Sequence, residues 1–177
     1  ACMDLLETIR HAAGHGAKFN FMWDGSESNE DGLNGTCAAR DLMKDVQHTM
    51  KSDGQCEEQI KRTSIGWIYF WSDAFLRCFV KQSENSVWIL TVTICPPESE
   101  KTSGRNTYVL AMGKSSDDHS DVIDHYIEEM SKLMTGFECF FGSTNDIRRM
   151  AVAMIAWNAD RPERQMLGET RKEGLHG

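Results

Sequence analysis

The feature that most constrains the fold is an apolar run at residues 87–94, which ends just before Pro96 and Pro97. Most of the run is β-branched, and β-branched side chains favour strands. A strand that is apolar at nearly every position is typical of the interior of a sheet, where both faces are buried. Proline cannot donate a hydrogen bond to a central ladder, so the proline pair ends the strand. The chain is therefore predicted to contain a sheet with residues 87–94 inside it.

Further strands are predicted on both sides of this run. Residues 65–70 are rich in β-branched and aromatic side chains, and a polar pair that ends at Asp73 closes the run. Residues 107–112 are expected to pair with the strand at 87–94 as a hairpin with a long loop. Residues 150–157 are continuously apolar. Their Ala and Met content also permits a helix, but their length and position favour a buried strand.

Helical spacing of apolar residues predicts helices at residues 3–13, 37–51 and 119–134. The apolar stripe of the third helix consists of Val122, Ile123, Tyr126, Ile127, Met130 and Leu133. We expect two parts: a helical N-terminal region, residues 1–64, and an α/β core, residues 65–177, truncated at its C-terminus.

Composition excludes several classes of protein. The chain has 177 residues, 40% of them hydrophobic, which is enough to bury a core. No run is long and apolar enough for a membrane span, and the N-terminus lacks a secretory signal. The six cysteines include no CxxC pair, so we expect reduced thiols in an intracellular protein and no zinc ribbon. The net charge of −8 argues against this chain clamping nucleic acid alone, and suits a cation site or ordinary solubility.

The order of these elements resembles the first half of the ribonuclease H fold, which ribonucleases H, retroviral integrases and DDE-type transposases share. The resemblance rests on a strand closed by Asp73, two more strands, a helix, and a strand followed by Asp160. The stretches FVKQSENSVWILTVTICPP and WNADRPERQ are also similar to transposon-like reading frames of eukaryotes. Together the similarities cover about residues 65–177. They imply a ribonuclease H-like mixed sheet with a flanking helix.

The resemblance also implies a chemistry. In the family, two strand-end carboxylates converge and hold two divalent metal ions that clamp the attacking and leaving oxygens. Asp73 and Asp160 would be the catalytic and metal-binding residues, with Mg²⁺ or Mn²⁺ as the cofactor. The implied activity is phosphodiester cleavage or strand transfer on DNA, in the nucleus. A third acid has no matching position, because Glu128 and Glu129 lie off the apolar stripe of their helix.

Other interpretations stay open at this stage. The alternative function is a binding or scaffold module of transposon descent that lacks catalysis. Asp73 would then cap a turn, and Asp160 would begin a helix before Arg161 and Pro162. Asp24, which follows another short strand at residues 19–23, is a rival for the first acid.

Three further clusters of charged or metal-binding residue types lie outside the Asp73 and Asp160 pair, and none of them requires a functional site. His11 and His15 have the i, i+4 spacing of two zinc ligands, but no Glu follows as in HExxH, so we interpret them as exposed helix-end residues. Acidic residues near 117–121 suit the N-terminus of a helix. A basic group fits either a phosphate-facing edge or a solvated surface; it comprises Arg148, Arg149, Arg161, Arg164, Arg171 and Lys172.

Overall fold

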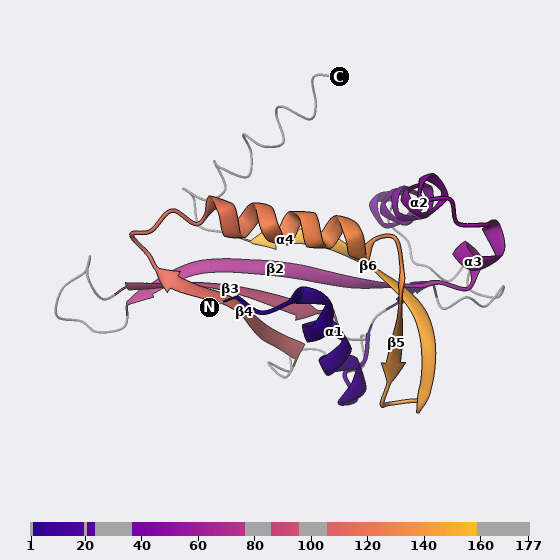
Figure 1. Cartoon of the computed structure of the whole chain (residues 1–177), viewed down its shortest axis with the longest axis horizontal. Helices are drawn as coiled ribbons and strands as arrows, with labels where there is room; N and C mark the ends of the chain where they lie inside the picture. The colour runs from indigo at the N-terminus through magenta and orange to yellow at the C-terminus, as the bar shows by residue number, and fades with distance from the viewer. Residues whose placement is uncertain (1, 20, 24–36, 77–85, 96–105, 159–177) are drawn as a thin grey trace, which may run out of the picture.

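The computed structural model describes residues 2–19, 21–23, 37–76, 86–95 and 106–158 (Figure 1). It contains helices α1 (Leu5–Gly14), α2 (Cys37–Ser52), α3 (Glu57–Lys61) and α4 (Ser120–Leu133). Its strands are β1 (Phe21–Trp23), β2 (Ser64–Leu76), β3 (Ser86–Ile94), β4 (Thr107–Lys114), β5 (Phe137–Phe141) and β6 (Asp146–Asn158). The predicted helices at 3–13, 37–51 and 119–134 are confirmed as α1, α2 and α4. Residues 150–157 form a strand within β6 and not a helix.

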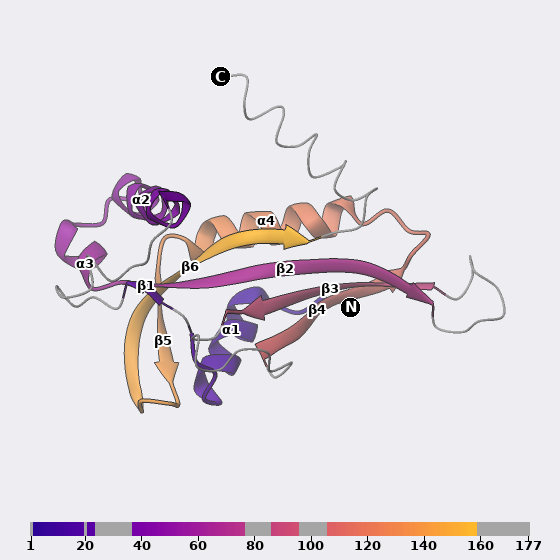
Figure 2. The ribbon, with the colours of Figure 1, turned by 180° about the vertical axis from the view of Figure 1, so that it is seen from behind.

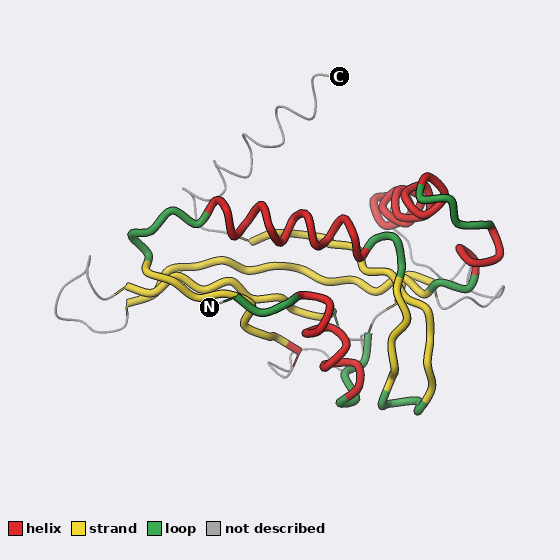
Figure 3. The backbone as a smooth tube through the Cα atoms, in the orientation of Figure 1, coloured by secondary structure: helices red, strands yellow, loops and turns green. Residues whose placement is uncertain are grey.

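The strands form one mixed sheet in the order β4-β3-β2-β6-β5, and β1 pairs with the beginning of β2. β2 runs antiparallel to β3 and parallel to β6, so it lies in the middle of the sheet. β3 and β4 form the predicted antiparallel pair. A mixed α/β sheet with a flanking helix and an N-terminal helical region is therefore present, as the sequence predicts (Figure 3).

The strand order differs in one respect from that of ribonuclease H, in which the strand after the helix lies beside the first strand, in the order 3-2-1-4-5. Here β5 follows α4 but occupies the edge, and β6 takes the inner position beside β2. A short turn through Asn145, which has a φ of 52°, joins β5 to β6, and such a turn permits only an antiparallel hairpin. β6 carries the fully buried residues Met150–Ala153, so the more apolar strand of the hairpin lies inside the sheet.

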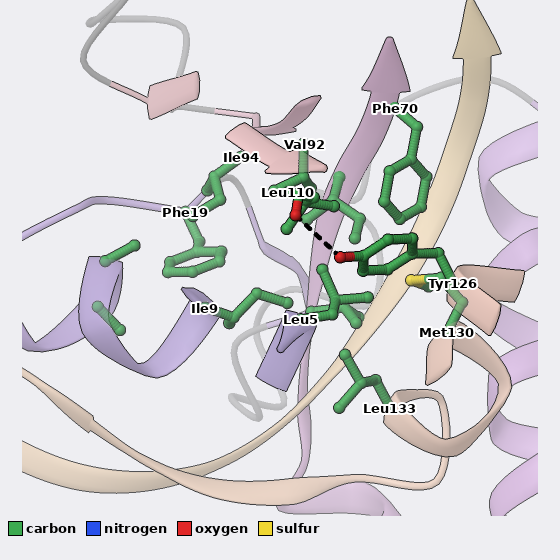
Figure 4. Packing of buried hydrophobic residues seen from close by; sticks show 14 of the residues in the cluster. Leu5, Ile9, Phe19, Phe70, Val92, Ile94, Leu110, Tyr126, Met130 and Leu133 are labelled. Atoms are coloured by element: carbon green, nitrogen blue, oxygen red, sulfur yellow. Dashed lines mark hydrogen bonds between the residues drawn. The ribbon is translucent and has the colours of Figure 1, made fainter. Parts of the chain in front are cut away.

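One face of the sheet packs against α4 and α1 and holds the main core (Figure 4). Alternate residues of β3 point into this core, namely Trp88, Leu90, Val92 and Ile94. They lie against the α4 stripe of Ile123, Tyr126, Met130 and Leu133. The hydroxyl of Tyr126 donates to the carbonyl oxygens of Met3 (2.6 Å) and Leu110 (3.0 Å), which ties helix, strand and N-terminal segment together. Burial raises the pKa of Tyr126 to about 12, so the phenol keeps its proton at neutral pH.

Two expectations about α4 need correction. The sequence pattern places Ile127 in the apolar stripe, but its side chain is 36% exposed. Residues 123, 126, 130 and 133 follow a three-and-four spacing that defines the buried face, and position 127 falls on its flank. Glu129, which the sequence places off the apolar stripe, is nevertheless mostly buried and accepts a hydrogen bond from the Leu5 N–H (3.3 Å).

The N-terminal helix shares this core and does not stand apart from the sheet. Leu5, Ile9, Ala12 and Ala13 of α1 are completely or almost completely buried among the sheet residues. The C-terminal turn of α1 packs so closely on the β5–β6 turn that a Cβ atom at Gly142 would lie 2.3 Å from the Gly14 carbonyl oxygen. The Gly142 N–H donates to the Ala13 carbonyl oxygen there (2.9 Å).

The opposite face of the sheet is covered only in part by described elements. α2 and α3 bury a second, smaller cluster at the end where β2 begins, with Val46, Met50 and Ile60 packed on Ile65. Figure 2 views this face, with β6, β2, β3 and β4 in front of α4 and α1. Beyond α2, no helix in the described ranges lies over these strands.

The corrected helix phase gives a stability test. Replacing Met130, which is buried, with Asp places an unpaired charge in the main core and should lower the free energy of unfolding by more than about 3 kcal/mol. Ile127→Asp, on the flank of the same helix, should cost about 1 kcal/mol or less. Urea denaturation of both variants measures the difference, and equal losses would contradict the observed orientation of α4.

Candidate functional site

The uncovered part of the sheet carries the most distinctive surface of the described structure. Side chains of a strand alternate between the two faces. Phe70 and Ser72 point into the core, so Tyr69, Trp71 and Asp73 lie on the opposite face. The register extends this surface to Ile89 and Thr91 of β3 and to Val109 and Met112 of β4. We call these seven residues the open face.

Large apolar side chains of the open face are exposed. Trp71 is 49% exposed, Met112 is 51% exposed and Val109 is 44% exposed. The rings of Tyr69 and Trp71 lie edge to face, with centroids 6.1 Å apart. On the opposite face of β2, Trp157 covers the strand. Its indole N–H donates to the Ser72 hydroxyl (3.1 Å), and its ring packs on Phe70. The aromatic pair thus rests on a well-packed strand.

Few charges accompany these side chains. Of the described residues with this orientation on β2, β3 and β4, only Asp73 and Lys114 are charged. Lys114 lies opposite Val87 on the outer strand, and Asp73 lies opposite Ile89. The surface between them is apolar, aromatic or hydroxyl-bearing. A charge-poor apolar surface is unusual on a chain with a net charge of −8.

The predicted position of Asp73 at the end of a strand is wrong. β2 continues to Leu76, because its ladder with β3 extends to the Leu76–Ser86 pair. Asp73 therefore lies within the strand, exposed at the edge of the open face. Asp160, its predicted partner, lies outside the described residues. The last described residue of β6, Asn158, pairs with Trp71, so the two parallel strands run toward the same end of the sheet.

The remaining candidate acids do not join Asp73. Glu128 and Glu129 belong to α4, which packs on the other face, so the sheet separates them from it. Glu128 pairs with Lys132 (3.0 Å), and Glu129 lies near His125 (3.6 Å). Asp24 is outside the described ranges. Within those ranges, no group of three or more His, Cys, Asp or Glu side chains could hold a metal ion.

The acidic cluster before α4 has a structural role. Asp118 accepts hydrogen bonds from the Ser120 hydroxyl (2.6 Å) and the Ser120 N–H (3.0 Å). These bonds, the hydroxyl bond first, lower the pKa of the Asp118 carboxyl. His119 stacks on Trp88 with ring centroids 4.0 Å apart, and its Nε2 lies 2.8 Å from the Lys114 carbonyl oxygen. His119 therefore connects the start of α4 to the end of β4, and Asp118 stabilises the first residue of the helix.

The described part of the basic group does not form a phosphate-facing edge. Arg148 pairs with Asp146 (2.8 Å) and lies over the Phe141 ring. The Arg148 hydrogen bond is the largest cause of the lowered pKa of Asp146. Arg149 is half-buried and turned toward protein acceptors. Arg161, Arg164, Arg171 and Lys172 lie outside the described residues.

Arg149 closes a polar clasp between distant parts of the chain. Its guanidinium donates to Gln55 Oε1 (2.7 Å), Thr63 Oγ1 (3.2 Å) and the Thr135 carbonyl oxygen (3.1 Å). The Gln55 amide also donates to that carbonyl oxygen. Gly136 has a φ of 94°, and a Cβ atom there would lie 2.9 Å from the guanidinium, so the clasp needs glycine at this position. No sequence motif marks this arrangement.

The cysteines agree with reduced thiols where the structure describes them. Cys2, Cys56, Cys95 and Cys139 are free. Burial raises the pKa of Cys95 to about 11 and also raises the pKa of Cys139, so neither is an activated nucleophile. Cys78 lies outside the described ranges.

Comparison with models of known protein families and with curated protein sequences gives no match. None of the described helices is long and apolar enough to cross a membrane. The function must therefore be inferred from the geometry of the chain itself.

The clasp predicts different consequences for two neighbouring arginines. Arg149→Ala removes three hydrogen bonds and should lower the free energy of unfolding by about 2–3 kcal/mol. Arg148→Ala breaks a largely exposed pair and should cost less than about 1 kcal/mol. Urea melts of the two variants measure this. Equal stability of both variants would show that Arg149 faces solvent and is free for another role.

Proposed function

We propose that this chain is a protein-interaction module whose contact surface is the open face. The observation that carries the proposal is the exposure of Trp71 on β2 and of Val109 and Met112 on β4, on one face of the sheet and separated only by Thr91 and Ile89 of β3. Contiguous exposed apolar surface of this kind marks interaction sites, and Trp and Met are enriched at the centres of protein interfaces. This corresponds to the binding or scaffold alternative that the sequence left open.

The charge pattern favours a polypeptide over a nucleic acid as the partner. A nucleic-acid surface needs Lys and Arg to neutralise phosphates. The described open face adjoins one lysine, Lys114, and includes one acid, Asp73. A partner with an apolar centre would bury Trp71 and Met112, with Asp73 and Lys114 at the rim of the contact. The hydroxyl of Thr91, which lies between Trp71 and Val109, offers a hydrogen bond to the partner's backbone.

A peptide selection tests this assignment. A displayed random peptide library is selected on the full chain, and the affinity of the recovered peptides is measured by fluorescence polarisation. We expect peptides rich in apolar residues. Trp71→Ser should weaken their binding about 30-fold or more, because truncating an aromatic hot spot typically costs about 2 kcal/mol. Met112→Ser should weaken it in the same direction.

Ile147→Ser is the matched control, because Ile147 is 70% exposed yet lies on the β5–β6 hairpin, away from the open face. Binding to this variant should equal binding to the wild type. Circular dichroism melts confirm that each variant is folded. Peptides that bind Trp71→Ser and Met112→Ser as tightly as the wild type would overturn the proposal.

A second candidate is the metal-dependent phosphodiester chemistry of the ribonuclease H type, with Asp73 and Asp160 as ligands of Mg²⁺ or Mn²⁺. The parallel pairing of β2 with β6 supports it, because the two acids follow Trp71 and Asn158, a register pair, by the same interval. The finer fold proposal is that β4-β3-β2-β6 corresponds to strands 3-2-1-4 of that fold, with β5 as an added edge strand. DNA would then be the substrate.

Thermal melts with Mn²⁺ test this second candidate. A metal that binds only the folded chain stabilises it by about 2.7 kcal/mol at a hundredfold excess over its dissociation constant. Wild type should melt higher with Mn²⁺, and Asp73→Asn and Asp160→Asn should each lose that shift. Wild type that shows no shift at millimolar Mn²⁺ would exclude the two-aspartate site.

A further inference from the structure

The exposed side of α1 carries two histidines whose rings are already in contact. His11 and His15 are one helical turn apart, and their ring centroids lie 4.1 Å apart at an interplanar angle of 33°. Both residues are exposed, opposite the buried Leu5, Ile9 and Ala12 of the same helix. At the i, i+4 spacing both imidazoles lie on the same side of the helix, where each can turn a ring nitrogen towards one ion.

The orientation of His15 is fixed by a hydrogen bond. Its Nδ1 lies 2.8 Å from the His11 carbonyl oxygen. A carbonyl oxygen only accepts, so Nδ1 carries the hydrogen and Nε2 keeps its lone pair. Metal-binding histidines usually donate their second ring N–H to a backbone carbonyl or a carboxylate, which sets the tautomer and the ring direction. His15 therefore has the arrangement of a metal ligand.

Hydrogen bonds and packing hold the supporting backbone at this point. The His15 N–H continues the helix by donating to the His11 carbonyl oxygen (3.1 Å). The adjoining Ala13 is buried, and its carbonyl oxygen accepts from the Gly142 N–H on the β5–β6 turn. The two histidines thus lie at a helix end that packs on the core through Ala13 and is hydrogen-bonded to the β5–β6 turn through Gly142. Because the His15 ring is already held, mainly the His11 side chain must be ordered when an ion binds, which favours binding.

We propose that His11 and His15 chelate a divalent transition-metal ion through one imidazole nitrogen each. Imidazole suits Zn²⁺, Ni²⁺ and Cu²⁺, whereas Mg²⁺ and Mn²⁺ favour oxygen ligands. The described residues supply no third His, Cys, Asp or Glu ligand at this position. The ion therefore keeps coordination positions for water or for a donor from another molecule. This site lies on α1 and is independent of both functions proposed above.

A Ni²⁺ titration tests the site on the full chain, by isothermal calorimetry, after alkylation of accessible thiols such as Cys2 and Cys56. Wild type should bind one equivalent more than the variants His11→Ala and His15→Ala, or bind it at least about tenfold more tightly, because two linked donors bind cooperatively. The control is His48→Ala, which removes another exposed histidine, on α2, and should bind as the wild type does.

Two further measurements make the result decisive. Electron paramagnetic resonance of bound Cu²⁺ should show two nitrogen donors in the wild type and fewer in each single variant. Metal-free melts of His11→Gln and His15→Gln check that any loss of binding does not come from unfolding. Unchanged Ni²⁺ affinity in the His11 and His15 variants, or an equal loss in His48→Ala, would overturn the proposal.

Discussion

The pairing of β2 with two strands of opposite direction is the constraint on which the rest of the structure depends. β3 runs antiparallel along one edge of β2, and β6 runs parallel along the other. The parallel pairing requires a connection that leaves the sheet and returns, and α4 with the β5 edge strand provides it. The helix packs on one face as a result of this path, and the main core forms under it. Among the described residues, only α2 and α3 lie over the other face.

Those two faces divide the side chains of a single strand between different roles. Ile68 and Phe70 stabilise the main core, while Tyr69 and Trp71, which alternate with them, reach the opposite surface. The acids follow the same division: Asp73 lies with Trp71, and Glu128 and Glu129 lie beyond the sheet. A metal site that drew on the acids of α4 and β2 together is excluded by this geometry. Within the described residues, no further His, Cys, Asp or Glu side chains join Asp73 in a group of three that could hold a metal ion.

The strands and helices could be predicted from the sequence because their periodicity is strong. Residues 87–94 and 119–134 illustrate this, with one continuous apolar run and one clear apolar stripe. The edge position of β5 could not be predicted, since a short apolar strand does not show which neighbour it pairs with. The open face was also missed, because residues 67–71 are aromatic or apolar at every position and no polar alternation marks the solvent side. The direction of His15 and the clasp of Arg149 depend on hydrogen bonds to backbone carbonyls, which leave no trace in residue identity.

The Arg149 clasp joins parts of the chain that the main core does not hold together. Its partners Gln55 and Thr63 are 94 and 86 positions away along the chain. Thr63 and Arg149 each come directly before the register pair Ser64–Met150, so the pairing of β2 with β6 brings them together. Gln55 lies between α2 and α3, and Thr135 lies between α4 and β5. One guanidinium therefore links the segment that carries α2 and α3 to the end of α4, at a place that the apolar contacts of the main core do not include.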